Sequence, residues 1–283
     1  GIDVRVKVLG RDIGDNAFES VGNVVLIVVD DTIKTIGKQA FMNCANLEVI
    51  SIGNSVSIIG EDAFKGCDKL ARVNVSSIQQ YCSMKYANVF SFPLNGNCEI
   101  EREVSLRIND NEPGREIIIP EGTNMIPPFA FSKCQCIEKV YSSNSVVGIG
   151  SLAFLGCVNL KEFDFGEKPK LEVIGSNAFV CSGIERIVIP SNVERIGVQA
   201  FAGCNKLNYV VIPKAMKVIQ KSVFAGCEGL ISVFYGGTEE QWDDIDIGED
   251  NFCIRGILNV QYEVSYEDVN NRSTLLMTVI CKK

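Results

Sequence analysis

One short pattern, a phenylalanine that follows Ala or Val, recurs along most of this 283-residue chain. Four of its seven intervals are 23 residues long, two are 22 and 25, and one of 67 has room for about three repeats. Cysteines recur three residues after most of these phenylalanines, with Cys181 one position early. Two interleaved series with one period indicate an array of stacked repeats. The markers are Phe18, Phe41, Phe64, Phe131, Phe154, Phe179, Phe201 and Phe224, with Cys44, Cys67, Cys134, Cys157, Cys204 and Cys227.

Each repeat contains three short sides. The first, Ala-Phe-x-x-Cys-x-x-Leu, has apolar residues three apart, which predicts a single helical or 3₁₀ turn. The second alternates apolar and other residues, as in 186–190, and predicts a strand with one face in the core. The third is Val-x-x-Ile-Gly, whose glycine suits a tight corner. About twelve coils at roughly 4.8 Å each would make a rod on the order of 55–60 Å long.

The pattern divides the chain into four segments. A first block begins within a repeat, and a second block is more regular. Between them an irregular insertion module lacks the Phe and Cys markers, and we expect it to contribute strands to the stack. A C-terminal segment follows the second block, where Trp242 is expected to cover the open end of the core. Whether 252–283 completes this cap or starts another domain stays open. The segments are 1–77, 78–115, 116–235 and 236–283.

Composition argues against several classes of function. The net charge of −8 and pI near 4.8 disfavour nucleic acid and anionic membrane surfaces as partners. No run of 18 apolar residues is present, so membrane insertion is not expected. The chain contains no histidine, which removes the commonest general base and metal ligand. We therefore expect neither catalysis nor a cofactor.

The cysteines are possible zinc ligands and the acidic residues are possible calcium ligands, but the spacing of neither set favours a metal site. None of the 12 cysteines forms a C-x-x-C pair, and only Cys134 and Cys136 come close, so zinc is not predicted. We interpret the periodic cysteines as small buried side chains, while disulfides between neighbouring coils stay open. The acidic segment that begins at Glu239 lacks calcium-loop spacing, so we expect a solvated cap.

The formula A-F-x-x-C-x-x-L-x-x-I-x-I-P-x-x-V-x-x-I-G resembles the BspA-like leucine-rich repeats over roughly residues 13–235. Pro is missing after the strand in some copies, as at Gly53 and Gly166. The resemblance implies a leucine-rich-repeat solenoid of the α/β type, in which short helical or 3₁₀ turns and a parallel sheet form an elongated right-handed rod. It also implies a secreted or cell-surface protein, with any signal peptide upstream of this sequence. It brings no catalytic residues.

The outward positions of the strands form columns on one face of the expected sheet. Toward the C-terminal end these columns become apolar and aromatic, as expected of a contact surface. The alternative is that these residues are simply good strand formers, covered by Trp242 or by the terminal strands. The candidate binding residues are Tyr141, Val188, Tyr209, Val211 and Phe234.

Three functions are compatible with these features. The favoured one is a non-catalytic surface protein that binds or adheres to a protein or glycan partner, such as host matrix or a cell surface, through the exposed sheet face. The second is an intracellular or spacer-type scaffold for protein interactions. The third is a glycosidase that uses paired carboxylates such as Glu162 and Asp164. A flat sheet builds no pocket around that pair, so the third is disfavoured.

Overall fold

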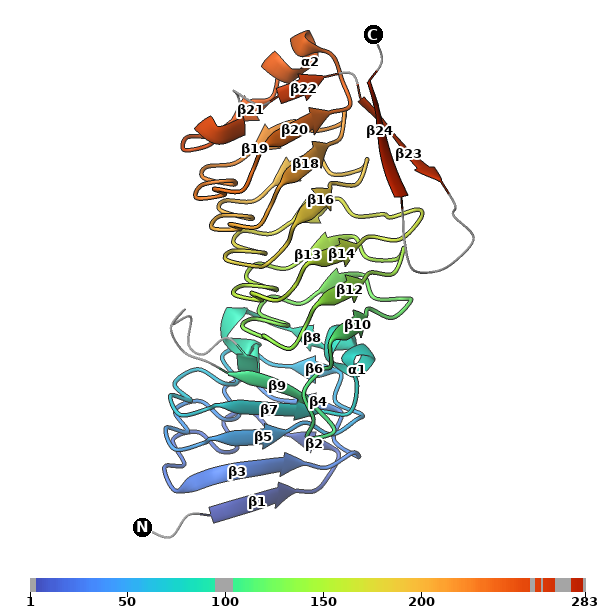
Figure 1. Ribbon diagram of the computed structural model, residues 1–283. Helices are drawn as coiled ribbons and strands as arrows, with labels where there is room; N and C mark the ends of the chain where they lie inside the picture. The colour runs from blue at the N-terminus through green and yellow to red at the C-terminus, as the bar shows by residue number, and fades with distance from the viewer. Residues whose placement is uncertain (1–3, 95–103, 255–257, 261, 268–275, 282–283) are drawn as a thin grey trace.

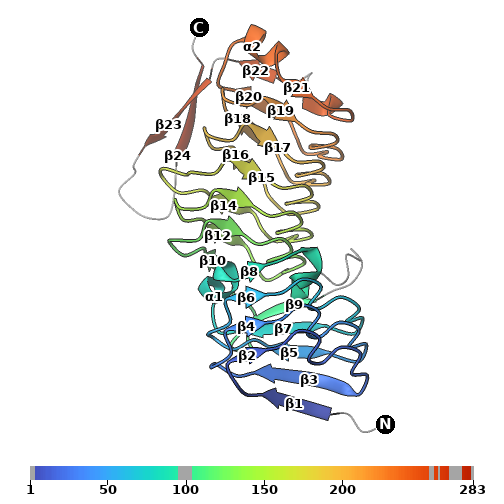
Figure 2. The same ribbon diagram turned by 180° about the vertical axis from the view of Figure 1, so that it is seen from behind.

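The protein is a rod of stacked coils (Figures 1 and 2). The computed structural model describes residues 4–94, 104–254, 258–260, 262–267 and 276–281. The described N-terminal residues lie at one end of the rod, and the last coil, with helix α2 (Glu239–Asp243), lies at the other. The prediction of a parallel-sheet solenoid with a repeat near 23 residues is confirmed, and the described part contains few helices.

Most coils contribute one strand to a main face and one two-residue strand to a second face. The pairings within both faces are parallel. The main-face strands are β1 (Val4–Val8), β3 (Val24–Val29), β5 (Val49–Ser51), β7 (Arg72–Val75), β9 (Ser105–Ile108), β10 (Glu116–Ile118), β12 (Lys139–Tyr141), β14 (Glu162–Asp164), β16 (Arg186–Val188), β18 (Tyr209–Ile212), β20 (Ser232–Tyr235) and β22 (Leu258–Val260). The second-face strands are β2 (Asp12–Ile13), β4 (Thr35–Ile36), β6 (Ile58–Ile59), β8 (Lys85–Tyr86), β11 (Met125–Ile126), β13 (Gly148–Ile149), β15 (Val173–Ile174), β17 (Arg195–Ile196), β19 (Val218–Ile219) and β21 (Asp246–Ile247).

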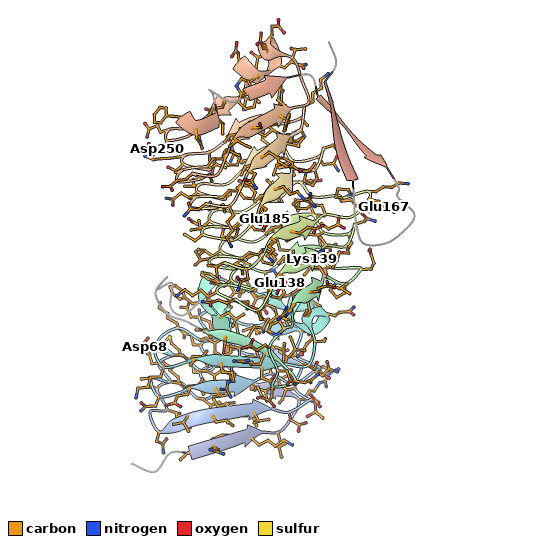
Figure 3. The ribbon with its side chains drawn as sticks, viewed as in Figure 1. Asp68, Glu138, Lys139, Glu167, Glu185 and Asp250 are labelled. Atoms are coloured by element: carbon orange, nitrogen blue, oxygen red, sulfur yellow. The ribbon has the colours of Figure 1, made fainter. Side chains whose placement is uncertain are left out.

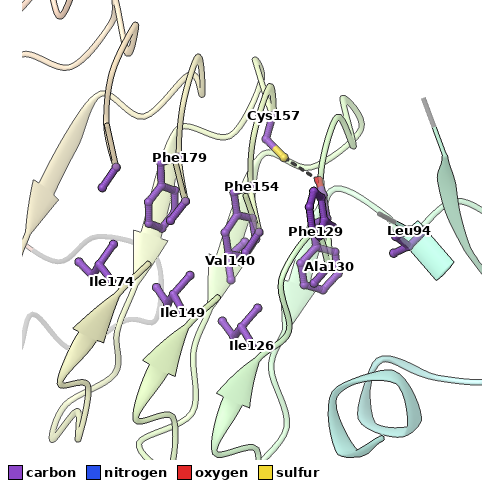
Figure 4. Packing of buried hydrophobic residues seen from close by; sticks show 14 of the residues in the cluster. Leu94, Ile126, Phe129, Ala130, Val140, Ile149, Phe154, Cys157, Ile174 and Phe179 are labelled. Atoms are coloured by element: carbon purple, nitrogen blue, oxygen red, sulfur yellow. Dashed lines mark hydrogen bonds between the residues drawn. The ribbon is translucent and has the colours of Figure 1, made fainter. Parts of the chain in front are cut away.

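Stacked phenylalanines fill the core between these faces. Phe154, Phe179 and Phe201 form a nearly parallel ladder with ring centroids 5.3 and 5.2 Å apart. All three rings are fully buried. Figure 4 shows Phe154 and Phe179 of this ladder beside the inward isoleucines Ile126, Ile149 and Ile174 of the second face. Because every coil places the same side chain at the same height, the period seen in the sequence is the spacing of the stack.

The side of each coil that carries Ala-Phe-x-x-Cys is a run of turns and not the expected helix or 3₁₀ turn. In the coil of Phe41, the Ala40 and Met42 amides close turns within the coil. The amides of the residues that follow each of them, Phe41 and Asn43, donate instead to the carbonyls of Ala63 and Lys65 in the next coil. A helix would direct all these amides along one chain, so stacking has redirected half of them. We call this part of each coil the turn side.

The glycine of Val-x-x-Ile-Gly has a different role from the expected one. At Gly197 the backbone φ is not positive, so the corner does not require conformational freedom. A Cβ added there would lie 2.5 Å from the Ser176 nitrogen and 2.7 Å from the Gly175 carbonyl carbon of the preceding coil. Glycine is needed because two backbones approach closely. In contrast, Gly203 before the cysteine has φ +69°.

The periodic cysteines, which follow the marker phenylalanines by three residues, fill the core and also donate hydrogen bonds through their thiols. Cys157 Sγ lies 2.9 Å from the carbonyl oxygen of Phe131 in the preceding coil (Figure 4), and Cys204 Sγ lies 3.0 Å from that of Phe179. The same bond recurs at Cys44, Cys67 and Cys227. In the shortened coil Ser182 takes the cysteine position, which leaves Cys181 exposed.

The buried thiols predict a loss of stability at high pH. Burial raises the pKa of Cys204 from 9.0 to about 11, so the unfolded chain releases this proton at a lower pH than the folded chain. The stabilisation is complete below about pH 8.5 and is lost as the pH rises through about 11, by about 3 kcal/mol for this thiol. Urea unfolding at about pH 7.5 and pH 10.5 should show the loss. Cys204→Ser, which copies Ser182, should make the loss smaller, and an equal loss in both proteins would contradict the assignment.

The insertion and the C-terminal segment contain the same sequence of elements. The insertion has α1 (Ile78–Ser83), β8, the 3₁₀ turn η1 (Val89–Ser91) and β9, and the C-terminal segment has α2, β21, η3 (Phe252–Ile254) and β22. Ser77 and Thr238 cap the two helices by accepting hydrogen bonds from Gln80 and Gln241. Strands β8 and β9 pair with β6 and β7, as expected of an insertion that contributes strands to the stack.

Both modules close a coil with an asparagine. Asn88 Oδ1 accepts from the Asp62 amide, and Asn251 Oδ1 accepts from the Phe224 amide. At the C-terminal end Trp242 is buried and packs edge-on against Tyr235, with centroids 5.2 Å apart. Beyond β22 the chain leaves the stack, because β23 (Tyr262–Glu267) and β24 (Leu276–Cys281) pair only with each other, antiparallel.

Candidate functional site

The register of the main-face strands brings most of the candidate residues together. Val188, Val211 and Phe234 are direct partners on neighbouring strands β16, β18 and β20. Tyr209 lies two residues before Val211 on the same face of β18. Its ring meets that of Phe234 edge-on, with centroids 6.1 Å apart. We call Val188, Tyr209 and Phe234 the aromatic group, and all three side chains are half-buried.

Two candidates differ from the expected arrangement. Val211 is only 6% exposed, so the expectation of an exposed side chain is wrong for this residue. It lies between Val188 and Phe234 in the register, in the middle of the three strands. Tyr141 lies on β12 and pairs with Asp164 on β14, so it is separated from the aromatic group by one coil.

Ile118, the other register partner of Tyr141, is 69% exposed and was not singled out among the candidates. Its place in the outward column is visible in the sequence, but an aliphatic residue in a strand gives no separate signal of function. It extends the apolar surface around Tyr141 toward the insertion.

Charged residues occupy the main face next to Tyr141. Lys139 Nζ lies 3.2 Å from Glu162 Oε2 on the neighbouring strand, and Arg115 Nη1 lies 3.1 Å from Glu138 Oε1. The hydrogen bond that Lys139 donates to the Glu162 carboxylate is the main cause that raises the pKa of Lys139 above its ordinary value. Figure 3 shows Lys139 on β12, Glu138 directly before this strand and Glu185 beside β16, all on the main-face side. The face is thus mixed in charge at β12 and β14, whereas at β16 to β20 the apolar side chains lie beside the exposed Arg186, the register partner of Tyr209.

The two carboxylates of the glycosidase hypothesis are engaged in structural contacts. Glu162 pairs with Lys139, and Asp164 Oδ1 accepts from the Gly166 amide at 2.8 Å. Among the described residues, no group of three Cys, Asp or Glu side chains could hold a metal ion. A shallow depression of about 360 Å³ lies at the C-terminal end of the stack, lined by Glu239, Trp242, Asp243, Ile245, Ile247 and Leu258.

Comparison with known families decides the classification. The BspA type leucine rich repeat region matches this chain in 6 copies, over residues 11–104 and 110–231. The chain belongs to this family. Family membership implies a protein-interaction or adhesion role and an extracellular or surface location, and these repeats are typically non-catalytic. Within the described ranges of this BspA-type repeat protein, no helix is both long and apolar enough to cross a bilayer.

Solved structures similar to this BspA-type protein include three bacterial proteins. A leucine rich cell surface protein from Faecalibacterium prausnitzii A2-165 is 20% identical over 87% of this chain and 91% of its own, with a TM-score of 0.47. A leucine-rich repeat protein from Bacteroides ovatus ATCC 8483 is 25% identical, covering 85% and 67%, with a TM-score of 0.44. The pneumococcal vaccine antigen PcpA is 16% identical, covering 88% and 90%, with a TM-score of 0.42. No curated protein matches the chain.

Proposed function

We propose that this protein is a non-catalytic, secreted or surface-exposed binding protein that holds a protein or glycan partner against the main face of its second block. The observation that carries the proposal is the aromatic group. Val188, Tyr209 and Phe234 form one apolar area on a face whose neighbouring coils carry ion pairs. Aromatic side chains on a rigid surface supply contact area at a low cost in conformational entropy.

The surface is suited to recognition because the strands beneath it are fixed from both sides. β18 is hydrogen-bonded to β16 and β20, so the backbone under Tyr209 does not need to become ordered when a partner binds. Binding then costs only the conformational entropy of fixing two half-buried rings against the partner. An extended partner could run along the rod and contact Tyr141 and Ile118 as well.

We expect the double substitution Tyr209→Ser and Phe234→Ser to weaken partner binding by about tenfold or more, since two contact side chains are lost. The melting temperature should fall by only a few degrees, because neither ring is in the core. The measurement is retention of the labelled protein on an array of extracellular matrix proteins and glycans. Val49→Ser is the matched control, since Val49 holds the position of Tyr209 in the first block. Unchanged retention of the double variant would contradict the proposal.

A further inference from the structure

The turn side of the second block differs in charge from the turn side of the first. Three segments in successive coils, 151–159, 176–183 and 198–205, contain no Asp, Glu, Lys or Arg, although 22% of the whole chain is charged. In the first block, the same side carries the ion pairs Lys38–Glu61 and Lys65–Asp62. Charge is therefore absent from one side of three neighbouring coils and present on the same side elsewhere.

These three segments form one continuous surface. The Gly156 amide donates to the Val180 carbonyl at 2.7 Å, and the Cys181 amide donates to the Ala202 carbonyl at 2.9 Å. Val158 and Val198 are 44% and 36% exposed. The surface lies on the side of the rod opposite β23 and β24 (Figures 1 and 2). We call its outward residues the uncharged stripe, namely Val158, Val180, Cys181, Val198 and Ala202.

We propose that the uncharged stripe is the contact surface for a second copy of this chain, packed antiparallel about a two-fold axis near Cys181. A protein with a net charge of −8 repels its own copies over most of its surface. Few charged and many apolar side chains are the composition expected of an interface core. The site is separate from the main face, so it does not depend on the proposed binding function.

The repeat spacing and the charges at the ends of the stripe both support a second copy of the chain as the partner. Two copies share one coil spacing, so side chains that project from successive coils of one copy can fit between those of the other along the whole stripe. The two-fold axis would place the coil of Lys133 opposite the coil of Gly226 and Glu228. Lys133 of one copy could then pair with Glu228 of the other at each end of the stripe. A different partner would need to reproduce both the spacing and this pair of charges.

The size of the stripe determines how stable a dimer we expect. It spans three coils, or five with the flanking coils of Lys133 and Gly226, which is about 20 Å at ~4.8 Å per coil. A stripe of this length offers less area than a standard interface, which buries about 1,200 Å² or more. We therefore expect a weak dimer, populated at high concentration or where many chains are held close together.

Cys181 provides the test, because it is exposed at the centre of the stripe and would face its own copy. A short bis-maleimide added to concentrated protein should yield a covalent dimer linked Cys181 to Cys181, identified by peptide mass spectrometry. Cys253 is also exposed but lies at the C-terminal end, so it reports random collisions. Links that join Cys181 and Cys253 in all combinations would overturn the proposal. A monomer at every concentration in sedimentation equilibrium would also overturn it.

Ala202→Glu should reduce the cross-linked dimer by about tenfold or more, since each added charge would be buried without a partner against the uncharged coil of Phe154 in the other copy. The variant should fold, because Glu19 and Lys65 hold the same turn-side position in other coils. The matched control is Met42→Glu, which adds the same charge at that position in the first block and should leave the dimer unchanged. If both variants reduce the dimer equally, net charge and not the stripe controls association.

Discussion

Replacing Gly197 with alanine should lower the free energy of unfolding by roughly 3–5 kcal/mol, one of the largest effects of any single methyl group in this chain. The added Cβ would lie 2.5 Å from the Ser176 nitrogen, 2.7 Å from the Gly175 carbonyl carbon and 2.9 Å from the Ser176 Cα. All three atoms belong to the backbone, so no side chain can rotate away. The coils must separate locally, which breaks hydrogen bonds such as that from the Gly197 amide to the Ile174 carbonyl. Urea unfolding followed by circular dichroism measures the change.

Gly14 is the control for this substitution because it holds the same position in the first described coil. A Cβ at Gly14 meets no atom within 4 Å, and its φ is not positive. Gly14→Ala should therefore leave stability unchanged or raise it by about 0.4–1 kcal/mol. Equal losses at Gly14 and Gly197 would show that the glycine is needed for its own backbone conformation and not for the approach of two coils.

Phe201→Ala should cost about 3–5 kcal/mol and weaken the stack in the middle of the second block. The Phe201 ring is fully buried between those of Phe179 and Phe224, at 5.2 and 5.7 Å. The substitution leaves a cavity and removes two stacking contacts, which contribute about 0.5–1.5 kcal/mol each. The melting temperature and the urea midpoint should both fall.

Phe18 is the matched position at the end of the other phenylalanine stack. Its ring has one stacking neighbour, Phe41 at 5.5 Å, and is only partly buried. We expect Phe18→Ala to cost less than half as much as Phe201→Ala, since fewer contacts are lost. A larger loss at Phe18 than at Phe201 would contradict the view that the stack is stabilised by its buried middle.

The sequence predicts the stack and the main-face register well. Aligning the repeats by Phe and Cys places Arg186 beside Tyr209 and Val188 beside Val211, and both pairs are partners in the sheet. This succeeds because, in a stack of in-register parallel strands, a residue's partner is simply its equivalent in the next repeat. One period therefore gives both the element and its pairing.

Features that depend on the neighbouring coil are not predicted in the same way. The spacing of Ala-Phe-x-x-Cys is the same for a 3₁₀ turn and for successive turns whose amides alternate between coils. Only the position of the next coil decides between them, as the Phe41 amide shows by donating to Ala63. The burial of Val211 similarly involves the neighbouring strands that carry its register partners Val188 and Phe234, which alternation along a single strand does not include.

The turn-side stripe was also not visible from the repeat formula. The formula marks the inward residues, and the uncharged positions lie between them. Only the inter-coil hydrogen bonds of Gly156 and Cys181 show that these positions form one surface. Comparing the charges at equivalent positions of the two blocks would have revealed the uncharged stripe in the sequence.

Hydroxyl-radical footprinting tests most directly the central claim, that the main face of the second block binds the partner. The oxidation rates of Tyr209 and Phe234 are compared with and without the array member that retains the protein best. Phe252, which is 79% exposed at the C-terminal end, is the internal reference. We predict that oxidation of Tyr209 and Phe234 falls about threefold or more, as expected for rings desolvated at an interface, while Phe252 is unchanged. Equal rates for Tyr209 and Phe234 in the free and bound protein would contradict the account.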